Sequence, residues 1–483
     1  MVFSSYLFLF YFLPAALLCY YVAPRRGQHL VLTVLSYVFY GWANPLFVPL
    51  LLGSTTVDYV AGRVIAARPA SPQSGRMEGG AAERWHPARV AVVASVCSNL
   101  ALLGFFKYFN FGAENLDALA RWLNLPALGL DGALRVTLPL GISFYTFQSM
   151  SYTLDVYRGR APAIRNFVDF ACYVSMFPQL VAGPIIRFSE IADQLVLRTH
   201  TMEKFARGVA FFALGLAKKV LLANPCGKIA DLAFDAGSRS PLEAWYGVTA
   251  YAFQIYFDFS GYSDMAIGLG LMLGFVFPKN FDSPYRSQSI TEFWHRWHIS
   301  LSTWLRDYLY VPLGGNRKGP LRTYVNLFIV MLLGGLWHGA AWTFVVWGAV
   351  HGALLALERL RGKSAVYGAV PAPARMVLTF AIVLVTWVFF RAPDMPHAVA
   401  YLGDMVGAGA RHPGAGLLAG IVYQPYYLAT FIIAAVIVWG APQTWDWTRT
   451  LTAGRAAIAL ALFALSAVVL ATQAFNPFIY FIF

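Results

Sequence analysis

Three stretches of this chain carry polar side chains that could do chemistry, and two of them lie within long apolar runs, where a polar side chain is costly and usually has a partner or a function. One is His338, which follows Tyr324 by 14 residues in a predicted membrane span. At 1.5 Å per residue this is about 21 Å along a helix, deep in a hydrocarbon core about 30 Å thick. A neutral imidazole there can accept the proton of a hydroxyl group as a general base. A structural core histidine is the alternative, and the residues alone leave both readings open.

The neighbours of His338 bear on this choice. Gly334, Gly335 and Gly339 would leave room beside its ring for another backbone or for a substrate. His351 follows 13 residues later, about 220° around the helix axis. We therefore expect His351 to lie away from the His338 site unless the helix breaks.

The second polar stretch, residues 292–308, carries two histidines. Glu292 and His295 have the spacing of a di-iron ligand pair, but such a site needs a second copy and two more carboxylates. We predict no metal site, and we interpret His295 as a surface basic residue. The spacing of His298 assigns it no role. Three tryptophans and two arginines make the stretch typical of an interfacial helix: Trp294, Trp297, Trp304, Arg296 and Arg306.

The third stretch, residues 256–264, contains Asp258 and Asp264. Six residues separate them, about 240° around a helix, so they cannot form a paired acid and base on one face. We interpret them as buried structural polarity that orients other groups. Gly268, Gly270 and Gly274 follow without a preceding strand, which excludes a nucleotide-binding fingerprint and favours close helix packing.

The composition indicates a membrane protein. Hydrophobic residues make up 58% of the 483 residues and charged residues 12%, against about 45–50% and about 25% in soluble domains. The 14 Trp, 26 Tyr and 38 Phe exclude a disordered chain. Continuous apolar runs exclude a transmembrane barrel. The net charge of +13 is explained by basic cytoplasmic loops, so we predict no nucleic-acid partner.

The apolar runs predict an all-α, polytopic integral membrane protein. Residues 1–22 have no preceding Lys or Arg and are interpreted as a retained first helix. Residues 167–186 are broken by prolines and a glycine, which is typical of a re-entrant segment. Further spans are predicted at residues 30–43, 46–65, 90–109, 134–156, 205–222, 244–275, 324–350, 376–390, 426–438 and 456–471, for roughly eleven crossings.

The remaining segments are predicted to be loops. Residues 66–89 and 278–322 are rich in Lys and Arg and belong on the cytoplasmic side. Residues 224–243 form an outer loop. We find no internal repeat and no soluble domain, so residues 1–483 are predicted to form a single domain. The four cysteines, Cys19, Cys97, Cys172 and Cys226, lie far apart and indicate no disulfide framework.

Four strings carry a family likeness: LPLGISFY (138–145), YFDFSGYSDMA (256–266), WHISLSTWLRDY (297–308) and LWHGA (336–340). With them, the chain resembles the membrane-bound O-acyltransferase family, and within it the bacterial branch that O-acetylates alginate. The ends MVFSS (1–5) and NPFIYF (476–481) fit that branch too. The likeness weakens at 66–89 and 392–425, and His295 stands where a residue such as Arg is expected.

This resemblance implies a fold, a reaction and a site. It implies a ring of helices, with interfacial and re-entrant helices, around a central funnel in the bacterial inner membrane. The intramembrane histidine of the family falls on His338 and its second histidine on His298. Acetyl-CoA from the cytoplasm is the implied donor and is not a tightly bound cofactor. The basic segment 278–322, through Arg296 and Arg306, would attract the donor phosphates; a solvated positive loop is the alternative.

The predicted function is therefore O-acetylation of an exported polysaccharide, with alginate as the first candidate. Periplasmic partner proteins are predicted to pass the acetyl group to the polymer. Cellulose, another exopolysaccharide and peptidoglycan are alternative acceptors, and a related branch transfers D-alanine toward teichoic acid. The competing class is a transporter or exporter subunit. Asp258, Asp264, Lys218 and Lys219 would suit an ion path, but the paired broken helices of transporters are missing.

Overall fold

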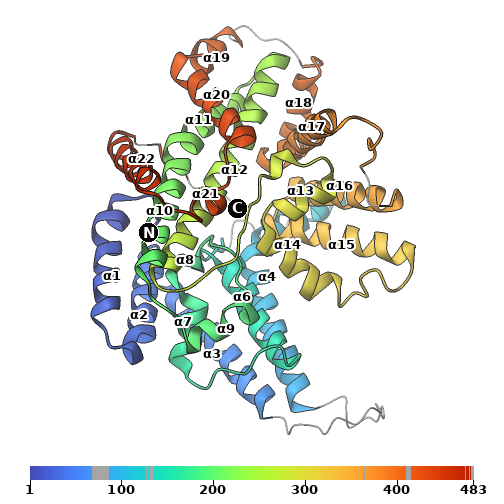
Figure 1. Cartoon of the computed structure of the whole chain (residues 1–483). Helices are drawn as coiled ribbons and strands as arrows, with labels where there is room; N and C mark the ends of the chain where they lie inside the picture. The colour runs from blue at the N-terminus through green and yellow to red at the C-terminus, as the bar shows by residue number, and fades with distance from the viewer. Residues whose placement is uncertain are drawn as a thin grey trace. The chain divides into compact units, whose positions relative to one another are not determined.

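Every regular element of the described residues is a helix (Figure 1). The computed structural model describes residues 1–67, 86–126, 129, 135–362, 365–409, 415–473, 475–477 and 479. The predicted all-α class is confirmed. Most of the predicted loop at residues 66–89 lies outside the described residues.

Within the described residues, five helices are long and apolar enough to cross a membrane. They are α4 (Pro87–Trp122), α15 (Pro320–His338), α16 (Trp342–Leu360), α17 (Ala372–Arg391) and α22 (Ala453–Thr472). Two shorter apolar helices are Leu7–Val22, which ends in α1 (Leu13–Val22), and α20 (Pro425–Gly440). Several membrane-length helices therefore agree with a polytopic protein, and the predicted eleven crossings remain a prediction.

The chain contacts divide into two compact units. Unit 1 consists of Met1–Phe205 and Gly270–Phe277. Its further helices are α2 (Gln28–Gly41), α3 (Phe47–Ala66), α6 (Ile142–Tyr157), α7 (Phe167–Ser175), α8 (Phe177–Leu180) and α9 (Phe188–Val196). The predicted break in residues 167–186 is present, because α7 ends before Met176 and α8 begins with Phe177 and Pro178. A single domain over residues 1–483 stays a prediction.

Unit 2 consists of Ala206–Leu269 and Pro278–Phe483 and contains all the candidate site residues. Its further helices are α10 (Met202–Ala217), α11 (Asn224–Asp235), α12 (Pro241–Met272), α13 (Ile290–Arg296), α14 (Ile299–Leu305), α18 (Met395–Met405), α19 (Ala415–Val422) and α21 (Thr444–Trp447).

The predicted loop at residues 224–243 is wrong over its first half. A π-helical stretch, Lys218–Ala223, joins α10 directly to α11. Pro225 lies in the first turn of α11 and has no N–H to donate to the helical turn before it. The wider π-helical turn before it relieves the clash that proline makes in a regular helix.

Glycines let α10 and α12 approach closely. A Cβ added to Gly261 would lie 2.7 Å from the carbonyl oxygen of Gly215, and one added to Gly268 would lie 2.6 Å from that of Gly208. Neither distance is possible for a side chain, so these positions require glycine. The interpretation of Gly268 as a packing residue is confirmed.

The predicted single span at residues 324–350 is also wrong. Residues Gly339–Ala341 break it into α15 and α16, which run side by side (Figure 1). A Cβ on Gly335 would lie 2.3 Å from the carbonyl oxygen of Phe344, and one on Gly348 would lie 2.5 Å from that of Met331. The room beside Gly335 is therefore filled by the backbone of α16, and His338 becomes the last residue of α15.

Candidate active site

His338 stands at the C-terminal end of α15 in a cage of aromatic rings. Its side chain is 6% exposed. The centroid of its ring lies 5.0 Å from that of Trp337, 5.3 Å from that of Trp347 and 5.1 Å from that of Phe390. These rings come from α15, α16 and α17. They surround the imidazole with apolar surface.

A pocket of about 550 Å³ in unit 2 includes His338 in its lining. Its walls are mostly aliphatic and aromatic: Trp294, Ile299, Leu301, Leu305, Leu327, Val330, Met331, Trp347 and Leu355. Gly334, one turn before His338, lines it too, and a Cβ there would meet only Leu305 at 3.5 Å. Part of the room predicted beside His338 is therefore pocket. A volume and lining of this kind suit a small-molecule ligand.

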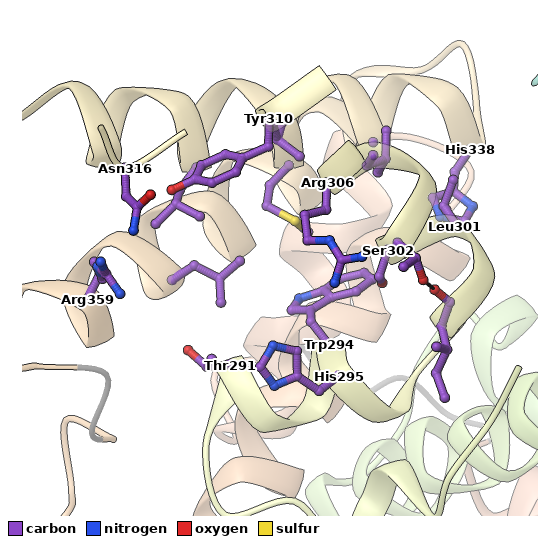
Figure 2. Close-up of a pocket in the computed structure, with 18 of the residues that line it drawn as sticks. Thr291, Trp294, His295, Leu301, Ser302, Arg306, Tyr310, Asn316, His338 and Arg359 are labelled. Carbon is purple, nitrogen blue, oxygen red and sulfur yellow. Dashed lines mark hydrogen bonds between the residues drawn. The ribbon is translucent and has the colours of Figure 1, made fainter. Parts of the chain in front are cut away.

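Polar and cationic side chains line the pocket away from His338. Figure 2 shows Asn316 and Arg359 at the end opposite His338, with Arg306 between the two ends. Arg306 also pairs with the carboxylate of Asp307 at 2.8 Å. Arg306 and Arg359 give this part of the pocket a positive charge, and guanidinium groups bind phosphate well. An anionic group with an apolar arm would match this arrangement.

The structure separates the two arginines named from the sequence. Arg306 lines the pocket, whereas Arg296 is absent from its lining. Arg296 pairs with Glu292 one helical turn away at 2.8 Å and donates a hydrogen bond to the carbonyl of Asp282. A phosphate-binding role for either arginine stays a prediction.

His298 is fully buried and lies outside that pocket lining. It caps the N-terminus of α14 with φ of 45° and ψ of 55°, the left-handed conformation that is costly for a residue with a Cβ. Its ring meets that of Phe259 edge-on at 4.6 Å, and its Nδ1 lies 3.2 Å from Oδ1 of Asn280. Burial lowers the pKa of His298 to about 3, so the ring is neutral at ordinary pH.

One indole connects the two histidines named from the sequence. The ring centroid of Trp337 lies 5.0 Å from that of His338 and 6.1 Å from that of His298. The structure therefore places His298 and His338 against the same side chain, although 40 residues separate them in the chain.

The acidic residues of α12 are held by lysines. Lys219 lies 2.7 Å from Asp258, and Lys218 lies 2.7 Å from Asp264. Asp258 also accepts a hydrogen bond from the backbone N–H of Ile479. These pairs join α12 to the π-helical stretch Lys218–Ala223, and the bond from Ile479 adds the C-terminal segment. Among the described residues, neither carboxylate is a hydrogen-bond or ring partner of His298.

Sequence reasoning placed His351 away from His338 unless the helix broke, which it does, and it missed Trp347 and Phe390. His351 accepts a hydrogen bond from the indole N–H of Trp294 and lies 3.1 Å from the hydroxyl of Thr386, so both ring nitrogens have partners. Its ring lies 4.9 Å from that of Trp347, one turn earlier on α16. The helix break at Gly339–Ala341 places Trp347 5.3 Å from His338, so the two histidines share this indole. In the sequence, a glycine and two alanines interrupt the bulky apolar pattern after His338, but small residues also occur inside helices and do not by themselves mark a turn.

Comparison with known proteins decides the family. The membrane-bound O-acyltransferase family pattern matches residues 160–363. The chain is 44% identical to a probable alginate O-acetylase of Pseudomonas putida over the full length of both proteins. It is 49% identical to the corresponding protein of Pseudomonas aeruginosa over 82% of this chain and 73% of that one. A peptidoglycan O-acetyltransferase of Helicobacter pylori is 37% identical over 84% of this chain and 80% of its own.

The chain belongs to the membrane-bound O-acyltransferase family. The resemblance carried by the strings at 256–266, 297–308 and 336–340 is thereby confirmed. A membrane-bound O-acyltransferase needs an acyl donor and a hydroxyl acceptor. The matched region contains the pocket, His298 and His338.

Proposed function

We propose that this membrane-bound O-acyltransferase takes acetyl groups from cytoplasmic acetyl-CoA for the O-acetylation of an exported polysaccharide. Alginate is the first candidate for this polysaccharide. The observation that carries the proposal is the pocket itself. His338, with its surrounding aromatic rings, lines one end of the pocket, and arginines line the other. The wall between the two ends is mostly apolar. Acetyl-CoA has a small thioester at one end, an extended arm, and phosphates at the other end. The thioester would lie beside His338 and the phosphates beside the arginines.

His338 is proposed as the general base. Its neutral ring would take the proton of the acceptor hydroxyl while the hydroxyl oxygen attacks the thioester carbonyl. The new C–O bond forms, the C–S bond breaks, and the proton passes to the departing CoA thiolate. The products are an acetyl ester and free CoA thiol, so the atoms balance with no added oxidant or reductant.

The apolar cage supports this role. Trp337, Trp347 and Phe390 would exclude water from the thioester and so limit hydrolysis. His298, on the other side of the Trp337 indole, is proposed as the second catalytic histidine, which accepts a hydrogen bond from the reacting groups. Arg306 and Arg359 are proposed to bind the CoA phosphates.

The proposal includes a membrane arrangement. We place the chain in the bacterial inner membrane as a multi-pass protein, with a ring of roughly eleven crossings around a funnel. Acetyl-CoA is large and anionic and cannot cross lipid, whereas an exported polymer is outside. Periplasmic partner proteins would receive the acetyl group and pass it to the polymer.

The acceptor is the least constrained part of the proposal. The relatives of Pseudomonas species are named for alginate, and the relative of Helicobacter pylori is named for peptidoglycan. Higher identity over the full length favours alginate. Assays should therefore compare alginate oligomers with peptidoglycan fragments as acceptors.

The test measures free CoA thiol released from acetyl-CoA by the purified protein, with and without alginate oligomers. We expect acceptor-dependent release from the wild type and none from His338→Ala. His397→Ala is the matched control, because His397 is an exposed histidine whose ring pairs only with Asp394. Release that persists in His338→Ala would contradict the proposal. Intact acetylation with lost polymer export would instead favour the exporter alternative.

A further inference from the structure

Asn280 is held beside His298 by two backbone hydrogen bonds between their segments. The carbonyl of Asn280 accepts from the N–H of Ile299 at 2.9 Å, and the N–H of Asp282 donates to the carbonyl of Arg296 at 2.9 Å. Residues 280–282 therefore run along the connection between α13 and α14. The Asn280 side chain is 1% exposed and faces the His298 ring.

The orientation of the Asn280 amide follows from its partners. Its Oδ1 accepts a hydrogen bond from the backbone N–H of Ser300 at 3.2 Å and from the hydroxyl of Ser300 at 2.9 Å. A backbone N–H can only donate, so the side-chain atom facing it must be the oxygen of the amide and not its nitrogen. The amide of Asn280 therefore cannot be flipped.

The fixed amide determines the state of His298. Nδ1 of His298 lies 3.2 Å from the same Oδ1, which has lone pairs and no hydrogen to give. Nδ1 must therefore carry the proton and donate it. The contact of Nδ1 with the Ser300 hydroxyl, at 3.5 Å, is too long to reverse this assignment. A neutral imidazole protonated on Nδ1 has its free lone pair on Nε2.

We propose that Asn280 is a positioning residue that fixes the tautomer of His298, so that Nε2 presents a lone pair to the reacting groups. Among the described residues, Nε2 is buried and has no hydrogen-bond partner. Leaving a buried acceptor unpaired is costly, and native structures rarely keep one without a reason. The left-handed backbone of His298 is a second cost at the same residue. This inference rests on the proposed role of His298 in acyl transfer.

The surroundings of His298 are suited to a neutral ring. Phe259 of α12 and Trp337 of α15 contact it with apolar faces. The nearest charged residues of the adjoining segments have other partners: Asp258 and Asp264 pair with Lys219 and Lys218, Glu292 pairs with Arg296, and Lys279 pairs with Asp282 and Asp446. His338 follows Trp337 on α15, and His295 is exposed. An amide therefore sets the tautomer without adding a charge.

Asn280→Asp tests the proposal with almost no change in shape. A carboxylate can accept the same three hydrogen bonds, but its charge raises the pKa of His298 and stabilises the protonated ring. Protonation removes the Nε2 lone pair, so activity should now be lost as the pH falls. We expect the ratio of variant to wild-type kcat to fall about tenfold or more between about pH 8 and about pH 6. The KM for acetyl-CoA should not change, because Asn280 does not line the large pocket.

Asn280→Leu removes the acceptor for Nδ1–H and leaves the tautomer unfixed. We expect kcat to fall about 10-fold to 100-fold, as for other residues that orient a catalytic group, with no new pH dependence. Gln443→Glu is the matched control, because Gln443 lines the same small polar pocket as Asn280 and bonds Tyr256 and Ser283 instead of His298. If kcat of Gln443→Glu fell at low pH as much as that of Asn280→Asp, the proposal would be overturned, because any added negative charge in this pocket would then explain the effect.

A measurement that does not need turnover completes the test. Nitrogen-15 NMR of the imidazoles, with His298 identified by the signal lost in His298→Asn, reports which ring nitrogen is protonated. We expect a protonated Nδ1 in the wild type and a mixture of tautomers in Asn280→Leu. A protonated Nε2 in the wild type would overturn the proposal. A protonated Nδ1 with an active His298→Ala enzyme would refute the proposed function of His298 and leave the tautomer assignment standing.

Discussion

His338 and His351 pack against the same indole ring, that of Trp347, at centroid distances of 5.3 and 4.9 Å. His351 is fixed on its other sides by Trp294 and Thr386. Trp347 is 1% exposed and also stacks on Trp387 at 6.0 Å. The wall behind His338 is therefore a rigid group of rings, and its position sets how much space an acyl group has beside the imidazole.

Trp347 is expected to limit the length of the acyl group. Trp347→Ala would open a cavity next to His338 that can hold a longer acyl chain. The ratio of kcat/KM for butyryl-CoA to kcat/KM for acetyl-CoA should therefore rise about tenfold, the effect expected of one or two methylenes in an apolar pocket. Folding stability should fall by about 3–5 kcal/mol. Thiol release with both donors measures the ratio.

Trp387→Ala is the control for this prediction. It removes the same volume behind Trp347, but Trp387 does not line the pocket. The stability should fall as much, while the donor preference should stay with acetyl-CoA. An unchanged preference in Trp347→Ala would show that another surface limits acyl length.

Arg359 and Arg306 should contribute unequally to donor binding. Arg359 is half-buried in the pocket wall, whereas the Arg306 side chain is 59% exposed and already paired with Asp307. Arg359→Gln should raise the KM for acetyl-CoA about tenfold, as expected for a charged hydrogen bond worth about 1.5 kcal/mol. Arg306→Gln should raise it only about threefold, because exposed charges are screened. In both variants kcat should be retained.

Arg296→Gln provides the comparison, since Arg296 binds Glu292 outside the pocket lining. Its KM for acetyl-CoA should equal that of the wild type. Equal KM increases in all three variants would indicate long-range attraction by the basic segment and no specific phosphate site. Repeating the assay at high salt separates the two, because screening weakens the long-range effect most.

Gly335 should be the most sensitive position of the hairpin formed by α15 and α16. A Cβ there would overlap the carbonyl oxygen of Phe344, so Gly335→Ala must push the helices apart. We expect a stability loss of about 1–3 kcal/mol, typical of overpacking. Gly104→Ala in α4 is the control, because no atom lies within 4 Å of the added Cβ and alanine favours the helix. Thermal unfolding in detergent compares them; equal midpoints would contradict the predicted overlap.

The hairpin also shows where sequence reasoning reached its limit. Composition and apolar run lengths predicted a helical membrane protein because lipid leaves few alternatives. Residues 324–350 nevertheless contain no charge or proline to mark a turn, so one long span and two helices look alike. The break depends on the fit of Gly335 against Gly348, a contact between segments that a linear pattern does not reveal.

The site was predictable to a different degree. His338 was named as a candidate from its depth and its glycines, and His298 only from the family strings, because spacing alone gives no reason to prefer it to His295; both roles remain predictions. Asn280 could not have been found, since its role depends on backbone pairing with residues 296–299. Arg359 was missed because it follows a long apolar run and becomes a pocket residue only when α16 folds back.

The buried pair of Lys219 and Asp258 should be structural and not part of an ion path. The two side chains are 3% and 1% exposed. Asp258→Asn would leave Lys219 buried with no countercharge and should cost about 3–5 kcal/mol. The double variant Lys219→Met, Asp258→Asn removes both charges and keeps a side chain of similar shape at each position, so it should recover most of that loss. Urea or thermal unfolding of the wild type, the two single variants Asp258→Asn and Lys219→Met, and the double variant gives the coupling energy.

The pair of Lys218 and Asp264 serves as the comparison, because its side chains are 16% and 14% exposed and water can reach the charge that remains. Asp264→Asn should therefore cost less than Asp258→Asn. A folded double variant at 219 and 258 with normal thiol release would establish that the buried charges only hold the π-helical stretch Lys218–Ala223, α12 and the C-terminal segment together. A folded double variant that no longer releases thiol would contradict this prediction, because the two charges would then be needed for the transfer reaction and not only for folding.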